Sequence, residues 1–162
     1  MHPCPCGFFT DPKKECRCTP AQIQRYLSRI SGLLLDGIDI HLEVPRLNYE
    51  QLTRKTNAET SVQIKERVDK ARAVQKKRYK KDGFTFNAFL ESKEIEKYCR
   101  VNGEANELLK MAILELGLSA RSYDKVLKVA RTIADLEGAE ILEAAHISEA
   151  IGYRSLDRNL WA

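Results

Sequence analysis

The sequence contains no apolar run long enough to cross a bilayer, since stretches such as Leu33 to Leu35 fall far short of the roughly 18 residues required. It has no basic start followed by an apolar segment, so we expect no secretory signal. With 162 residues, 43% of them hydrophobic, the chain is able to bury a core. These features predict a soluble, cytoplasmic, globular protein without a membrane partner.

The sequence also has no loop suited to holding phosphates. Gly32 and Gly37 have the spacing of half a phosphate-binding loop, but Ile38 and Asp39 follow where that motif needs Lys and Ser or Thr. A dinucleotide-type glycine fingerprint is absent, and so is an acidic pair after an apolar run that would hold magnesium. We therefore expect this chain to be inactive as an enzyme on its own.

Proline and cysteine are almost absent from the second half of the chain. All five prolines lie at or before Pro45, and four of the five cysteines lie at or before Cys18. The part before Thr19 is predicted to be an irregular, Cys-rich loop. Thr19 followed by proline is a helix N-cap signal, so we expect a helix over Pro20 to Ile30 that Gly32 terminates.

A short strand is predicted before Pro45, because apolar and polar residues alternate there. The apolar positions are Ile38, Ile40, Leu42 and Val44. Asp39, His41 and Glu43 share the other face, where they could in principle ligate a metal or act as an acid–base group. The solvated face of an edge strand has the same pattern and is the preferred interpretation.

Positive charge is concentrated in one segment, although the net charge is only +4. The segment carries Lys65, Arg67, Lys70, Arg72, Lys76, Lys77, Arg78, Lys80 and Lys81 against Glu66 and Asp69. It lies largely on a helix predicted from Ser61 to Tyr79. A local basic surface fits a polyanion such as DNA, with Lys76, Lys77 and Lys80 as candidate contacts, although solvated helix faces are often basic too.

The rest of the chain is predicted to be helical, with Phe84, Phe86 and Phe89 as core anchors at its start. The expected helices are Ser92 to Cys99, Glu104 to Leu116, one capped by Ser119 and ended by Gly138, and Ala145 to Tyr153. Their apolar stripes need one another for burial, so residues 84–162 should form a four-helix unit.

Four cysteines form a C-x-C, nine residues, C-x-C pattern made of Cys4, Cys6, Cys16 and Cys18. In a reducing compartment such a cluster favours a structural zinc ion, which could stabilise a loop too poor in apolar residues to fold by itself. Reduced free thiols and redox-active disulfides remain alternatives. Cys99 and His146 lie in predicted helices, where we expect them to be packing residues.

Two arginines lie ten residues apart on the helix capped by Ser119. Arg121 is in the first turn, where the helix dipole disfavours a cation, whereas Arg131 lies further along. A cation in an unfavourable place is a candidate for binding an anion, although exposed arginines also occur there without a function.

Several longer motifs carry a family resemblance. They are Pro3-Cys4-Pro5-Cys6-Gly7, Arg17-Cys18-Thr19-Pro20, Gln24-Arg25-Tyr26, Arg29-Ile30-Ser31-Gly32, Leu35-Asp36, Ile38-Asp39-Ile40-His41, Leu118-Ser119-Ala120-Arg121 and the run from Leu127 to Leu136. Together they resemble the magnesium-chelatase-like AAA+ proteins of the ComM (YifB) type over nearly the whole chain.

The resemblance implies a larger protein with a Lon-protease-like domain, an AAA+ core with both nucleotide motifs, and then this region. Residues 1–45 would be the tail of the core, with its Cys-rich loop and strand, residues 46–83 a basic helical connector, and residues 84–162 the helical lid. Similar proteins have Asn where this sequence has His2, which puts a sensor role for that position in doubt.

The resemblance also assigns roles to arginines. Similar proteins carry an arginine finger after Leu-Leu-Asp, where this chain has Gly37, so the finger is missing. Arg29 could substitute for it at a neighbouring subunit. Arg121 falls at the sensor 2 position of the lid, where it would contact nucleotide phosphates.

The implied parent is an ATP- and Mg-dependent ring, expected to be a hexamer, that remodels DNA by branch migration during natural transformation. Its partners would be its own AAA+ core, neighbouring subunits and DNA. One alternative is a zinc-stapled helical module that binds nucleic acid or a protein. The other is a magnesium chelatase subunit.

Overall fold

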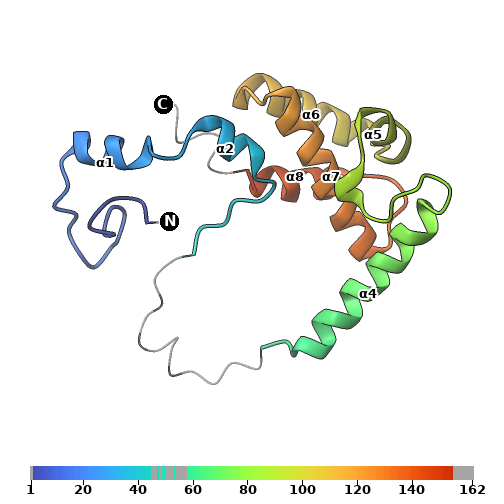
Figure 1. Cartoon of the computed structure of the whole chain (residues 1–162), viewed down its shortest axis with the longest axis horizontal. Coiled ribbons are helices and arrows are strands. Elements are labelled where there is room, and N and C mark those ends of the chain that lie inside the picture. Colours follow the sequence, from blue (N-terminus) through green and yellow to red (C-terminus); the bar gives the residue numbers. More distant parts are fainter. Residues whose placement is uncertain (1, 45–46, 48, 50–52, 54–57, 155–162) are drawn as a thin grey trace.

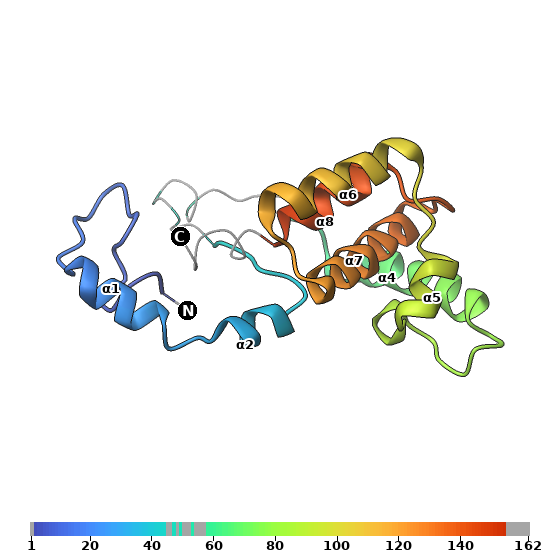
Figure 2. The same cartoon turned by 90° about the horizontal axis from the view of Figure 1, so that it is seen from above.

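The computed structural model describes residues 2–44, 47, 49, 53 and 58–154, and in these the fold is mainly α, as predicted. The elements are α1 (Pro20–Leu27), α2 (Gly32–Gly37), α4 (Ser61–Arg78), the short 3₁₀ helix η1 (Asn87–Phe89), α5 (Ser92–Tyr98), α6 (Gly103–Leu116), α7 (Ala120–Glu137) and α8 (Ala144–Gly152). Helices α4 to α8 form a bundle, and α1 with the N-terminal loop lies apart from it, beyond α2 (Figures 1 and 2).

Helix α7 is the centre of the bundle. It packs against α8, α4, η1 and α5, while α6 packs on α8. Its apolar stripe, predicted from helical spacing, supplies the middle of the core. The most deeply buried apolar side chains are Tyr79, Leu90, Ala105, Leu109, Val126, Ala130, Ala134, Leu142, Ile147 and Ala150. The four helices pack together, with α4 packed against them as well. Of the three phenylalanines predicted as core anchors, only Phe84 packs on the core, because Phe86 and Phe89 are exposed.

The helix ends follow the sequence signals closely. Thr19 caps α1 with reciprocal hydrogen bonds to Gln22, and the Ser119 hydroxyl accepts a hydrogen bond from the backbone N–H of Ser122 at the start of α7. Gly117 and Gly138 adopt left-handed conformations after α6 and α7, with φ of 59° and 81°. These predictions of helix boundaries are confirmed to within a few residues.

A parallel bridge fixes the loop before α6 against the loop before α8. Asn102 N–H donates to the Leu142 carbonyl at 3.0 Å, and Leu142 N–H donates to the Arg100 carbonyl at 2.8 Å. The bridge satisfies backbone groups where Leu142 is fully buried. It therefore holds the entrances of α6 and α8 side by side.

The predicted strand over residues 38–44 is wrong for this chain. The segment has no strand assignment, and Ile38, Ile40, Leu42 and Val44 are all exposed, Val44 by 88%. A strand needs a neighbour for its backbone hydrogen bonds, and the part of the chain that the structure describes offers no such neighbour. The alternating pattern is present, but the ladder that would make it a strand is not.

Gly32 was also misinterpreted as the end of the first helix. That helix ends at Leu27, and Gly32 is instead the first residue of α2. The Ser31 hydroxyl accepts a hydrogen bond from the Leu34 N–H at 3.2 Å, which makes Ser31 an N-cap. Ser31 is a cap signal in the sequence, but it was overlooked because the glycine after it was interpreted as the end of the first helix.

The boundaries proposed for the three regions, 1–45, 46–83 and 84–162, stay predictions, and much of the first part of the connector lies outside the described residues. Within the described part, α4 covers most of the helix predicted there. Over those same residues, no helix combines the length and apolar character that crossing a membrane requires.

Candidate functional site

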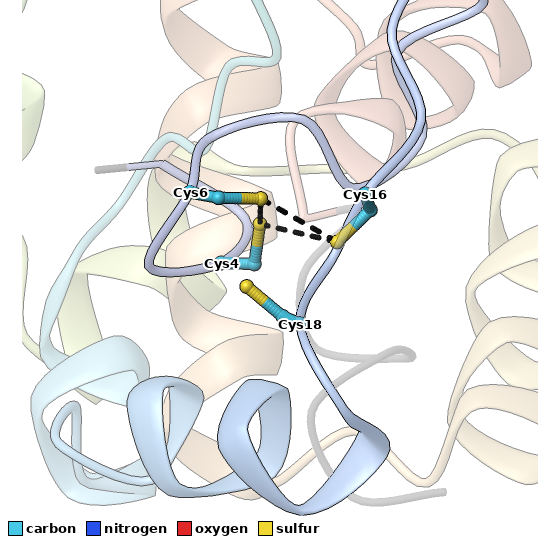
Figure 3. A group of neighbouring side chains, drawn as sticks. All are labelled: Cys4, Cys6, Cys16 and Cys18. Atoms are coloured by element: carbon cyan, nitrogen blue, oxygen red, sulfur yellow. Dashed lines mark hydrogen bonds between the residues drawn. The ribbon is translucent and has the colours of Figure 1, made fainter.

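The four N-terminal cysteines come together in one tight loop (Figure 3). Gly7, with φ of 80°, allows the chain to turn directly after Cys6, and its N–H donates to the Cys4 carbonyl at 3.1 Å. Thr19 begins α1 directly after Cys18, so the helix start fixes the fourth cysteine. The two C-x-C segments, which nine residues separate in the sequence, therefore face each other.

The spacing of the sulfurs fits a tetrahedral metal site. The Sγ atoms of Cys4 and Cys6 are 3.3 Å apart, Cys4 and Cys16 are 3.7 Å apart, and Cys6 and Cys16 are 3.6 Å apart. Zinc–sulfur bonds of about 2.3 Å place the corners of a tetrahedron about 3.8 Å apart. All four sulfurs, that of Cys18 included, lie within 4.8 Å of one another, and all are free thiols. The donor set and its spacing thus suit a zinc ion.

Local hydrogen bonds favour thiolate at part of this cluster. A hydrogen bond from the Phe8 backbone, opposed by burial, lowers the pKa of Cys6 to about 6. Burial acts to raise the pKa of Cys4, yet the Phe9 N–H, 3.4 Å from its sulfur, helps to lower it below the ordinary value. A backbone hydrogen bond of Cys18 acts to lower the pKa of Cys16, yet burial and the hydrogen bonds with Cys6 and Cys4 raise it to about 12. Thiolate, the form that ligates a metal, is therefore favoured at Cys4 and Cys6 but not at Cys16.

Cys99 and His146 are packing residues, as predicted. Burial raises the pKa of Cys99 to about 12, so its thiol stays protonated. His146 is buried in α8, where its Nδ1 accepts from the Glu143 N–H at 2.9 Å and its Nε2 lies 2.9 Å from a Glu137 carboxylate oxygen. Neither side chain belongs to the cysteine cluster.

The three polar residues of the predicted strand face do not form a site. His41 is buried, and its backbone N–H donates to the Tyr153 carbonyl at 2.7 Å. Asp39 instead pairs with Lys125 at 2.5 Å, and Glu43 is exposed. In the described residues, the cysteine tetrad is the group of side chains close enough together to hold a metal. The interpretation of these residues as a solvated face is therefore right for Asp39 and Glu43 but wrong for His41, which is buried.

The two arginines of α7 have different surroundings. Arg131 is 1% exposed and donates to the Ala139 and Glu140 carbonyls and to Asp135, which makes it a structural residue. Arg121 is exposed, and it makes no hydrogen bond or ion pair with any residue that the structure describes. Of the two, only Arg121 is placed to meet an external anion.

A buried polar cluster joins α4 to α7, and sequence reasoning missed it. The Asp135 carboxylate accepts from both Nη atoms of Arg78, from Arg131 Nε at 3.1 Å and from Asn87 Nδ2 at 3.0 Å. Burial acts to lower the pKa of Arg78, yet the bonds to Asp135 raise it above its ordinary value. This cluster makes α4 part of the bundle and not a loose connector.

Arg29 and Gly37, the two positions considered above for an arginine finger, are both exposed. Arg29 lies beyond α1, with its guanidinium 5.8 Å from the Tyr26 ring centre. Gly37 is the last residue of α2, and a Cβ added there would meet nothing within 4 Å. The glycine is therefore not required by packing, and a Cβ of the arginine that the resemblance implies here would meet no neighbour.

The basic face of α4 is open at its C-terminal end. Lys76, Lys77 and Lys80 are exposed and form no ion pair with the residues that the structure describes. At the other end, Lys65 pairs with Asp69 at 2.8 Å. The uncompensated charge therefore gathers near the end of α4 that packs on the bundle, in line with the candidate polyanion contacts.

Comparison with known proteins identifies the family. The pattern described as "Magnesium chelatase, subunit ChlI C-terminal" matches residues 58–154, and "Magnesium chelatase, subunit ChlI" matches residues 1–52. The chain belongs to the magnesium chelatase family. Its helical bundle, α4 to α8, is the C-terminal region of this family, as the resemblance implied.

The relatives refine this placement within the magnesium chelatase family. The chain is 44% identical over 161 residues to the competence protein ComM of Haemophilus influenzae, and 41% identical over 162 residues to the uncharacterized protein YifB of Escherichia coli. Each alignment covers 99% of this chain but only 30% and 31% of the relative. The chain thus spans less than a third of the length of these relatives and corresponds to one region of them.

Proposed function

We propose that this chain is the lid region of an AAA+ ATPase, in which ATP binding and hydrolysis drive DNA remodelling such as branch migration. The observation that carries the proposal is Arg121, an exposed cation in the first turn of α7 whose guanidinium makes no hydrogen bond with a described residue. Helix dipoles disfavour a cation at that place unless an anion meets it. The Asp36 carboxylate already interacts with Arg121 through space, and a nucleotide phosphate bound by an AAA+ core would be a second anion for its exposed guanidinium.

The proposal includes an assembly that this chain does not provide alone. ATP and Mg would be held by nucleotide motifs of the longer protein, since the chain has no Walker motif in its sequence. Arg121 would then report the nucleotide state through the angle of the lid, at a boundary between ring subunits. Arg29, exposed beyond α1, is the candidate contact to a neighbouring subunit.

Replacing Arg121 with alanine in the longer protein should lower its ATPase rate about a hundredfold, the usual effect of removing one preorganised charge-stabilising donor. The measurement is steady-state ATP hydrolysis with and without DNA. The matched control is Arg25→Ala, an exposed arginine on α1 that should leave the rate within about twofold. An unchanged rate in Arg121→Ala, with the fold intact, would remove the sensor role.

DNA is the proposed polyanion at α4. The exposed Lys76 and Lys77 lie on α4, and Lys80 lies in the turn directly after it. The Asp135 cluster holds this end of α4 against the bundle, so lid movement would be transmitted to this surface. Phosphate contacts by lysines need no sequence recognition, which suits an enzyme that moves along DNA.

Reversing charge at Lys76, Lys77 and Lys80 to glutamate should weaken DNA binding and reduce its salt dependence. Each lost phosphate contact lowers the slope of log affinity against log salt by about 0.9 for a duplex. Fluorescence anisotropy of labelled DNA at several salt concentrations measures both quantities. Lys110→Glu, an exposed lysine on α6, is the control. An unaltered slope in the triple variant would place the DNA surface elsewhere.

We further propose that Cys4, Cys6, Cys16 and Cys18 hold a structural zinc ion. The near-tetrahedral spacing of the sulfurs supports this assignment over free thiols. The ion would supply no reaction chemistry, because a closed four-thiolate site has no open position. Its role would be to fold the loop that precedes α1.

A further inference from the structure

The end of α2 is fastened to the start of α7 by a group of polar side chains. We call this group the α2–α7 latch. Its members are Asp36, Ser119, Ser122, Lys125 and Arg154. The Asp36 Oδ1 accepts hydrogen bonds from the Ser119 hydroxyl at 3.0 Å and from the Ser122 hydroxyl at 2.8 Å. These contacts join residues more than 80 positions apart in sequence.

Lys125 and Arg154 extend the latch to the backbone that follows α2. Lys125 Nζ donates to the Gly37 carbonyl at 2.6 Å, and a guanidinium nitrogen of Arg154 donates to the Ile38 carbonyl. The Arg154 side chain is 1% exposed, and it also donates to the Ser122 hydroxyl at 2.9 Å. The carbonyls of positions 37 and 38 are therefore held by Lys125 of α7 and by Arg154, two residues after the end of α8.

The latch also supplies a charge that α7 lacks. The first turn of α7 contains no acidic residue of its own, although the positive end of a helix favours one. Asp36 places a carboxylate there from another segment, beside Arg121. The Ser122 hydroxyl, together with Ser119, Arg154 and Arg121, keeps the pKa of Asp36 below its ordinary value. The carboxylate is thus ionised at neutral pH, and it is hydrogen-bonded to the two serines at the start of α7.

We propose that Asp36 is a positioning residue that makes residue 37 and Arg121 move as one body. The inference deepens the proposed lid function and rests on it for its consequence in catalysis. Position 37, which would face a neighbouring subunit, directly follows Asp36, and Arg121, which would face the nucleotide, directly precedes Ser122, so the Asp36–Ser122 hydrogen bond connects the two. A change in lid angle would therefore displace Gly37 and Arg121 together.

The latch itself is tested on this chain by hydrogen exchange. In Asp36→Ala, the amides of the first turn of α7 and of residues 36–41 should exchange about tenfold faster, as expected when a hydrogen bond to a charged group is lost. Asp36→Asn, which keeps an acceptor oxygen but loses the charge, should restore part of the protection. Exposed Glu43→Ala is the matched control and should change neither segment.

A second measurement connects the latch to catalysis in the longer protein. Asp36→Ala should lower kcat for ATP with little change in KM, and adding it to Arg121→Ala should cause no further loss, because both changes act through the same arginine. Additive losses would overturn the positioning role. If amide exchange in Asp36→Ala is unchanged, the latch is refuted. If exchange in Asp36→Ala is faster but Arg121→Ala keeps its ATPase activity, the proposed function alone is refuted.

Discussion

Replacing Asp135 with alanine should destabilise the bundle by about 3–5 kcal/mol, the usual cost of removing one partner from a buried ion pair. The side chain of Asp135 is fully buried, and its loss leaves Arg131 and Asn87 without their shared acceptor and Arg78 without its partner. Domains of this kind are stable by only about 5–15 kcal/mol, so the effect is a large share of the total.

Thermal or urea unfolding measures this loss. Asp69→Ala is the matched control, because Asp69 also pairs with a cation from α4 but at an exposed position, where such pairs contribute about 1 kcal/mol or less. Asp135→Asn should fall between the two, since it keeps an acceptor for Asn87 or Arg131 but not the charge. A midpoint for Asp135→Ala equal to that of the control would show that α4 is held by its apolar contacts alone.

Removing the metal should unfold the N-terminal loop while leaving the bundle intact. In small zinc-binding folds, the binding of the ion contributes about 10–16 kcal/mol to the stability of the fold at neutral pH. The N-terminal loop has few other buried contacts. Protein purified without chelator should contain about one zinc per chain by elemental analysis. Cys16→Ser should lose it, and limited proteolysis should then cut at Lys13 or Lys14.

The control for the metal is Cys99→Ala, which removes the fifth cysteine without touching the tetrad and should keep the full metal content. Acid should release the ion, because thiolates gain protons as the pH falls and protonated thiols do not ligate zinc. The zinc assignment would be refuted by metal-free protein in which four thiols of the loop titrate freely. The α4 to α8 core should keep its unfolding midpoint throughout.

Local signals in the sequence predicted local structure well. The N-caps at Thr19 and Ser119 and the left-handed glycines after α6 and α7 are short-range features, and each lies where the pattern placed it. The cysteine cluster was also predictable, because two C-x-C segments separated by nine residues can close on each other within one loop. In these cases the chain itself supplies every partner the feature needs.

Features that depend on distant partners were missed or mistaken. Asp36 and Ser122 are 86 positions apart, and Arg78 and Asp135 are 57 apart, so neither contact has a local signature. The missing acid in the first turn of α7 was a usable clue to the Asp36 contact. The strand over residues 38–44 failed for the opposite reason, because its local pattern was correct and its neighbours are not among the described residues.

Gly37 has an evolutionary consequence. Its backbone is not in the left-handed region, its Cβ direction is open, and Lys125 holds its carbonyl, a group that every amino acid has. Exchange between glycine and arginine at this position therefore requires no compensating mutation in α7 or in the core. A lineage could therefore lose the proposed contact with a neighbouring subunit, or regain it, by one substitution at this position without a change in the fold.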